Sequence, residues 1–205
     1  MSEEALDSGA SSGRALRLVS MSSAILLGHL RTFEPRGETE ASDLATAVAL
    51  ATSTDPWGRN TAIHFTASAL VVHPATKRVL LRWHARQRAW IQIGGHGDPG
   101  EIDPLAIAVR EGAEETRLPD LRPWPHDRLC QVVVVSVPGN DREPDHQHVD
   151  LRFLLATDQP QLAGEEHDGA AVRWLTVEGA QALTTEVNVR ELIRRSDRLL
   201  QGLAD

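Results

Sequence analysis

Residues 94–118 read GGHGDPGEIDPLAIAVREGAEETRL, a glycine-rich loop followed by a segment that carries the signals of a short helix. Asp103 is a good N-cap, and Pro104 suits the first helical position. The charged residues at positions 110, 111, 114 and 115 would then form a polar ridge. Three of them are carboxylates, which repel one another unless positive charge lies among them. Arg110 can neutralise one, and a divalent cation bound through hard oxygen ligands can neutralise the others.

The predicted helix is amphipathic. Leu105, Val109 and Gly112 recur at helical spacing, so we expect that side to be buried and the three glutamates to point into a cleft. The alternative is a solvated acidic face with i,i+4 pairing, such as Arg110 to Glu114. The preceding loop favours a phosphate or metal site, because glycines let main-chain groups approach a ligand closely. These glycines are Gly94, Gly95, Gly97 and Gly100.

The stretch resembles the signature of the Nudix hydrolases. That signature is a Gly, five residues, a Glu and seven residues, followed by Arg-Glu, an apolar residue, any residue and Glu-Glu. Any residue, a Gly and an apolar residue then end it. Gly95 and Glu101 match its first part. Its second part is matched by Arg110, Glu111, Glu114, Glu115 and Leu118. Because the pattern is long, spaced and charged, chance matches should be rare.

One departure from the signature affects the loop. Eight residues, not seven, separate Glu101 from Arg110. We expect the extra residue to bulge around residues 101–104, which leaves open whether the Glu101 carboxylate reaches Arg110. Asp98 or Asp103 could substitute for it.

Two other departures lie in the helix. Gly112 stands at an apolar position of the signature, and close packing of the helix against a neighbouring strand would account for it. Arg117 replaces the glycine that normally ends the helix. We expect Arg117 to affect only the helix exit, where the helix dipole favours positive charge.

The resemblance implies a role for each matched residue. Glu111 and Glu115 would bind the main divalent cation, Mg²⁺ or Mn²⁺, and Glu114 would hold a second ion or its water. The backbone carbonyl of Gly94 would be a further ligand, and Arg110 would orient the acids by salt bridges. Arg110, Glu111 and Glu114 are therefore the expected catalytic residues, and the metal site comprises Gly94, Glu111, Glu114 and Glu115.

Three residues outside the helix are candidate substrate-binding groups. Arg82 belongs to a basic segment that could meet substrate phosphates, or that could be a hairpin tip made soluble by charge. His96 lies in the glycine loop, where it could titrate near neutrality beside a phosphate or cap the loop. Glu166 lies in an acidic loop where many Nudix enzymes place a further carboxylate, with a solvated loop as the alternative.

A second group of metal-binding residue types follows later in the chain. His146 and His148 would share a face of a strand with Asp150, as in some zinc sites. The sequence shows no matching second cluster, and Cys130 is the single cysteine. We therefore interpret this segment as a strand that lines the substrate cleft.

The 205 residues, 41% of them hydrophobic, suit one domain with extensions. We predict an N-terminal tail and helical extension over residues 1–60 and a Nudix hydrolase domain over residues 61–205. Strands around a central helix, followed by closing helices, indicate an α/β/α sandwich with a mixed sheet. The resemblance implies the same fold.

Local patterns give the expected elements. Residues 1–13 are small and polar and are expected to be disordered. Apolar runs bounded by turn residues predict strands over 63–72, 79–83, 90–93, 131–137, 148–156 and 172–175. Helical patterns cover 14–33, 40–51, 177–183 and 186–203. The run 131–137 is continuously apolar, as in a strand covered on both faces, whereas 148–156 begins with alternation.

Charge and composition bear on partners and location. The net charge of −8 disfavours general binding of nucleic acid polymers, but a nucleotide remains possible because magnesium brings compensating charge. The N-terminus has no basic region typical of a signal peptide, and the apolar stretch 16–30 is too interrupted to span a membrane. One cysteine favours a reducing, cytoplasmic location. A homodimer is possible through the N-terminal helices.

The sequence predicts a metal-dependent pyrophosphohydrolase. It would cleave a nucleoside diphosphate linked to another moiety by attack of metal-activated water. The alternative is a catalytically weak or inactive Nudix-like nucleotide-binding module, which the loop insertion and Arg117 favour. A diphosphate isomerase of the same fold would need Cys130 as a reactive group, and its place at the start of a buried strand disfavours this.

Overall fold

The computed structural model describes residues 21–139 and 144–203. In these ranges eight strands form one mixed sheet, in which the long strands β1 (Ile63–His73) and β7 (His146–Ala156) run side by side in parallel. The other pairings are antiparallel. The sheet order is β3-β2-β1-β7-β5, with β4 also paired to β1, β6 to β7 and β8 to β2. The tail predicted over residues 1–13 lies outside the described residues.

The remaining strands are short. They are β2 (Arg78–His84), β3 (Ala89–Ile91), β4 (Ile93–Gly95), β5 (Arg122–Pro123), β6 (Gln131–Val137) and β8 (Val172–Thr176). A first helix runs to residue 31. The other α-helices are α2 (Gly37–Ala51), α3 (Pro104–Thr116), α4 (Val177–Leu183) and α5 (Val187–Leu200).

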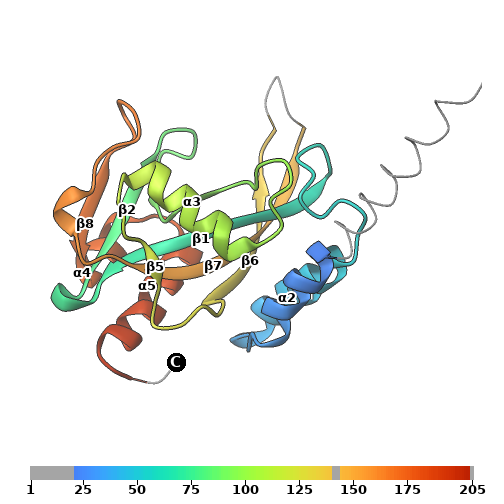
Figure 1. Ribbon diagram of the computed structural model, residues 1–205, viewed down its shortest axis with the longest axis horizontal. Helices are drawn as coiled ribbons and strands as arrows, with labels where there is room; N and C mark the ends of the chain where they lie inside the picture. Colours follow the sequence, from blue (N-terminus) through green and yellow to red (C-terminus); the bar gives the residue numbers. More distant parts are fainter. Residues whose placement is uncertain (1–20, 140–143, 204–205) are drawn as a thin grey trace, which may run out of the picture.

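Alternate residues of β1 enter two separate hydrophobic cores, because successive side chains of a strand point to opposite faces. Phe65 and Ala67 belong to the core beneath α3 and the N-terminal helices. Leu70 and Val72 belong to the core beneath α4 and α5. Figure 1 shows α3 across one face of the sheet and α4 and α5 across the other. The predicted α/β/α sandwich with a mixed sheet and an N-terminal helical extension is confirmed.

The alternation predicted for β7 is also observed. Val149, Leu151 and Phe153 point into the core under α3. The intervening polar residues lie on the other face, together with polar residues of β1, because the parallel register pairs the two strands residue by residue. The pairs are His64 with His148, Thr66 with Asp150 and Ser68 with Arg152.

The strands differ from the prediction in three details. The strand expected over 90–93 is two strands, because the chain leaves its pairing with β2 at Ile91 and begins to pair with β1 at Ile93. Strand β6 is buried only at its first two residues, so it is not covered on both faces. The two-residue strand β5 was not predicted, since its edge pairing with β7 has no local pattern.

The N-terminal helices share the core beneath α3. Leu26 and Leu30 of the first helix and Ala47 of α2 are buried in it. Figure 1 shows α2 beside β6. No helix in the described ranges combines the length and the apolar character that a membrane span requires.

A buried ion pair joins α2 to α5. Glu40 accepts two hydrogen bonds from Arg195, at 2.9 and 3.0 Å, and a third from the backbone N–H of Val132 in β6. Both side chains are less than a tenth exposed. On its other side, Arg195 also contacts the half-buried Glu191 at 3.0 Å. The N-terminal extension is therefore fixed to the last helix through the edge of the sheet.

Removing Glu40 should destabilise the whole fold, because it leaves the Arg195 guanidinium buried without its principal counter-charge. We expect Glu40→Ala to lower the free energy of unfolding by about 3–5 kcal/mol, measured by urea denaturation. Glu191→Ala removes the more exposed partner of the same arginine and should cost no more than about 1 kcal/mol. Equal losses in the two variants would contradict this account.

Candidate active site

Helix α3 begins and ends as its sequence dictates. The Asp103 side chain accepts a hydrogen bond from the backbone N–H of Leu105 at 3.0 Å, and Pro104 occupies the first turn. The predicted N-cap is therefore confirmed. The helix ends at Thr116, and the next residue, its C-cap Arg117, adopts the left-handed conformation with φ +57°. This conformation is costly for a residue other than glycine.

The buried side of α3 is centred differently from the predicted stripe. Ile107, Ala108 and Gly112 are buried, whereas Leu105 and Val109 are only partly buried. A side chain at Gly112 would place its Cβ 2.8 Å from Leu121 Cδ1 and 3.3 Å from Ile93 Cδ1. The glycine thus permits the close packing that its position predicted. The shift of the buried face also places Glu115 on it, so the prediction that all three glutamates avoid this face is wrong for Glu115.

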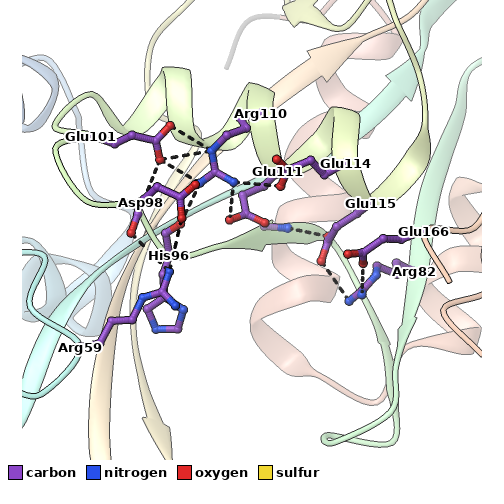
Figure 2. A network of polar contacts seen from close by, with 12 residues as sticks. Arg59, Arg82, His96, Asp98, Glu101, Arg110, Glu111, Glu114, Glu115 and Glu166 are labelled. Carbon is purple, nitrogen blue, oxygen red and sulfur yellow. Dashed lines mark hydrogen bonds and ion pairs between the residues drawn. The ribbon is translucent and has the colours of Figure 1, made fainter.

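Arg110 is the centre of the acidic cluster (Figure 2). Its Nη1 lies 3.1 Å from Glu111 Oε1 and 2.9 Å from Glu114 Oε2. Its Nη2 donates to the backbone carbonyl of His96 at 2.9 Å. One guanidinium therefore holds two carboxylates of the helix and the glycine-rich loop in a fixed arrangement.

Glu101 does reach Arg110, despite the extra residue in the loop. Its two carboxylate oxygens accept from Arg110 Nε at 2.9 Å and Nη2 at 2.8 Å. Asp98 and Asp103 do not substitute for it, since Asp98 donates its backbone N–H to Glu101 at 2.7 Å and Asp103 caps the helix. The loop absorbs the insertion before the helix starts. This pairing lowers the pKa of the Glu101 carboxyl.

Glu115 occupies a second, more buried part of the cluster. Its Oε2 accepts from the backbone N–H of Gly94 at 3.0 Å, and its Oε1 lies 3.1 Å from Arg82 Nη1. Arg82 Nη2 in turn lies 3.1 Å from Glu166 Oε2. The structure therefore brings Arg82 and Glu166, from β2 and a late loop, to the glutamates of α3 (Figure 2).

Two glycines let the loop and helix approach each other. Gly94 has φ +144°, and a Cβ there would lie 2.4 Å from Ser68 Oγ and 2.6 Å from the Ala67 carbonyl. A Cβ at Gly95 would lie 2.6 Å from Glu111 Oε1. A side chain at Gly94 would collide with the backbone of β1, and one at Gly95 would displace the Glu111 carboxylate.

Burial disfavours the charged form of two carboxylates, Glu115 and Glu111, and the neighbouring positive charges do not fully compensate for it. It raises the pKa of Glu115 to about 7, with Arg82 and the Gly94 N–H acting in the opposite direction. Burial also raises the pKa of Glu111, against the effect of Arg110. Both groups would be stabilised in their charged form by a further cation.

Arg117 does more than end the helix. Its Nη2 donates to the Glu166 carbonyl at 3.1 Å, and Gly164 N–H donates to the carbonyl of Thr116 at 2.8 Å. The expectation that Arg117 affects only the helix exit is therefore wrong. The residue holds the loop that carries Glu166 against the end of α3.

His96 differs from its predicted behaviour. Burial lowers its pKa to about 4, with nearby Arg59 acting in the same direction, so the ring does not titrate near neutrality. Its Nε2 lies 3.1 Å from His64 Nε2. The side chain thus belongs to a group on the α5 side of the sheet, while its backbone carbonyl belongs to the acidic cluster.

A polar cavity of about 190 Å³ lies against the glycine loop on the α5 side of the sheet, and none of the α3 glutamates lines it. Its lining includes Gly94, Gly95, His96, Gln92, Asp150 and Arg152. Asp150 accepts from Thr66 at 3.0 Å, Ser68 at 2.7 Å, Gln92 at 3.3 Å and Arg152 at 2.6 Å. It is therefore occupied by neighbouring donors and does not form a metal site with the histidines. The sequence analysis predicted the strand but missed Thr66, which the polar alternation of β1 could have indicated, and Gln92, which lies between β3 and β4 and has no such signal.

Cys130 is buried and lines a different cavity, with Arg36, Arg128 and Arg195. This placement agrees with the interpretation of the cysteine as a buried hydrophobe. The position gives no support to an isomerase.

The family follows from a direct match. A family model described as the NUDIX domain matches residues 63–196. The chain belongs to the Nudix family of hydrolases, whose signature residues surround Arg110. A comparison with curated proteins gave no match.

Solved structures support the same fold. An Ap4A hydrolase from C. elegans, in a binary complex, has a TM-score of 0.55 and 21% identity, over 68% of this chain and 98% of that one. A NUDIX family hydrolase from Clostridium perfringens has a TM-score of 0.51 and 22% identity, over 70% and 99%. The E. coli dihydroneopterin triphosphate pyrophosphohydrolase has a TM-score of 0.50 and 21% identity, over 64% and 92%.

The pKa of Glu115 predicts a pH-dependent stability difference. Its raised pKa means that the folded state holds more protons than the unfolded chain between pH 4.5 and about 7, so its contribution to stability falls as pH rises through that window. In metal-free buffer with chelator, Glu115→Gln should gain stability relative to the wild type from about pH 5 to about pH 8. Urea unfolding at each pH measures this, with exposed Glu178→Gln as control. A difference that does not change with pH would contradict the burial argument.

Proposed function

We propose that the chain is a metal-dependent pyrophosphohydrolase that cleaves a nucleoside diphosphate linked to another moiety. The observation that carries this proposal is the set of Glu111, Glu114 and Glu115 held around the bare backbone of the glycine loop, with two of the three carboxylates under-compensated. Family membership supports it, since the signature residues are those that the geometry gathers.

The donor set fits a hard divalent cation. The site offers carboxylate oxygens and a loop backbone from which the Gly94 carbonyl can serve as a ligand, and Mg²⁺ or Mn²⁺ prefers such oxygen donors. Glu111 and Glu115 would hold the main ion and Glu114 a second one. When bound, the ions would screen the diphosphate charge and make water a better nucleophile.

The protein side chains would position the reaction. Arg110 fixes Glu111 and Glu114 by its fork of hydrogen bonds and anchors the loop carbonyl of His96. Arg82 neutralises Glu115 and Glu166 in the described state. When a cation binds Glu115 and Glu166 in place of Arg82, the arginine becomes available to a substrate phosphate. Glu166 is then a candidate for the additional late-loop carboxylate.

The binding-module alternative loses its two supporting features. The loop insertion does not separate Glu101 from Arg110, and Arg117 does not open the helix end. We further propose a cytoplasmic enzyme that acts on a small nucleotide or diphosphate substrate, not on a nucleic acid polymer. A homodimer through the N-terminal helices stays a prediction.

The proposal is tested by a panel of nucleotides and nucleoside diphosphate derivatives, incubated with Mg²⁺ or Mn²⁺ and assayed for phosphate-containing products. We expect turnover of at least one diphosphate and a loss of at least about 100-fold in kcat/KM for Glu115→Gln, more than the usual cost of an outer-shell partner. Glu178→Gln serves as the matched control. Tight nucleotide binding in calorimetry without any product would favour the binding module instead.

Arg110→Lys tests the positioning role separately. Lysine keeps the charge but cannot bond three carboxylates and a carbonyl at once. We expect kcat to fall by roughly 10- to 100-fold with weaker Mg²⁺ activation and an unchanged melting temperature. Arg122→Lys, at an exposed ion pair with Asp158, is the control. A lysine variant with wild-type metal dependence would argue against this role.

A further inference from the structure

Four histidines, three from β1 and β7 and one from the loop after β4, gather on the α5 side of the sheet. His64 lies on β1, His96 directly follows β4, and His146 and His148 lie on β7. The parallel register of β1 and β7 places His64 directly beside His148. The sequence offered His146 and His148 without a second cluster, and the fold supplies that cluster.

The distances between the rings are those of a ligand set. Nε2 of His64 lies 3.1 Å from Nε2 of His96, and Nε2 of His146 lies 3.0 Å from Nε2 of His148. Ligand nitrogens of His64, His146 and His148 all lie within 4.8 Å of one another. In a tetrahedral site with Zn–N bonds of about 2.0–2.1 Å, the ligand nitrogens are about 3.3 Å apart. Small rotations of these three side chains would place their nitrogens around one ion, and a rotation of His96, which already contacts His64, would supply a fourth.

The four histidine rings pack against one another. The centroids of His64 and His96 each lie 4.8 Å from that of His148, and the centroid of His146 lies 4.9 Å from it. His64 is buried, and the other three are partly buried. Such packing limits the rotamers open to each ring and keeps the group together.

The chemistry of the cluster selects a kind of ligand. Each ring places a nitrogen toward a nitrogen of another ring in the group, and an imidazole nitrogen offers a lone pair to a metal. Imidazole nitrogens suit Zn²⁺, Cu²⁺ or Ni²⁺, whereas the carboxylates of α3 suit Mg²⁺ or Mn²⁺.

We propose that His64, His96, His146 and His148 form a binding site for Zn²⁺ or another late first-row divalent ion, distinct from the acidic cluster on α3. The ion would tie the glycine loop to both central strands through His96. The carbonyl of the same residue accepts from Arg110, so the site would also steady the loop on which the acidic cluster depends. The four-histidine site stands on its own geometry, whether or not the proposed hydrolysis occurs.

The test uses the full chain without an added histidine tag, stripped with a chelator and titrated with Co²⁺. Cobalt in a tetrahedral imidazole site absorbs visible light, and displacement by Zn²⁺ gives the zinc affinity. We expect one tight equivalent in the wild type and in Glu111→Gln/Glu115→Gln, which removes the main acidic ligands. His148→Ala should weaken zinc binding by more than about 100-fold. His73→Ala, at the far end of β1, is the matched control and should bind normally.

A thermal melt provides a second readout. One equivalent of Zn²⁺ should raise the melting temperature of the wild type but not that of His148→Ala. If His148→Ala does not fold, the more conservative His146→Gln, checked by circular dichroism, should show the weakened affinity. The proposal is overturned if the wild type takes up no stoichiometric Co²⁺ or Zn²⁺, or if binding persists unchanged in the histidine variants. It is also overturned if binding disappears in the glutamine double variant.

Discussion

The parallel pairing of β1 with β7 is the constraint on which the rest of the structure depends. Its register sends the odd residues of both strands into the core under α3 and the even residues to the other face, where those at 64–68 and 148–152 are polar. A slip of one residue would exchange these two sets. The acidic helix, the polar cavity and the histidine group are therefore all positioned by one strand pairing.

Around this pair, Arg110 converts an irregular loop into a defined site. It bonds the loop through the Glu101 carboxylate and the His96 carbonyl, and the helix through Glu111 and Glu114. Because Arg110 bonds both the loop and the helix, the additional loop residue is accommodated between Glu101 and the start of α3. The cluster keeps its arrangement although its spacing departs from the family signature.

The structure keeps two kinds of ligand on different sides of the glycine loop. Gly95 faces the Glu111 carboxylate, whereas His96 turns its ring toward β1 and β7. Hard oxygen donors and softer nitrogen donors are thus separated by a single stretch of backbone. Such separation would let two different cations bind on opposite sides of one loop without competing for the same ligands.

The sequence by itself determined the sandwich, the N-cap and first turn of α3 and the identity of the acidic cluster, because these follow from local spacing and side-chain chemistry. The tertiary structure decided which side chains from distant segments come into contact. Glu101 reaches Arg110 through a loop whose path no spacing rule gives. Glu115 is buried because the buried face of α3 is centred on Ile107 and Ala108 and not on the predicted stripe. His64 joins His148 only through the register of strands more than 70 residues apart in the chain. Contacts between distant segments depend on how the sheet closes, which no local pattern records.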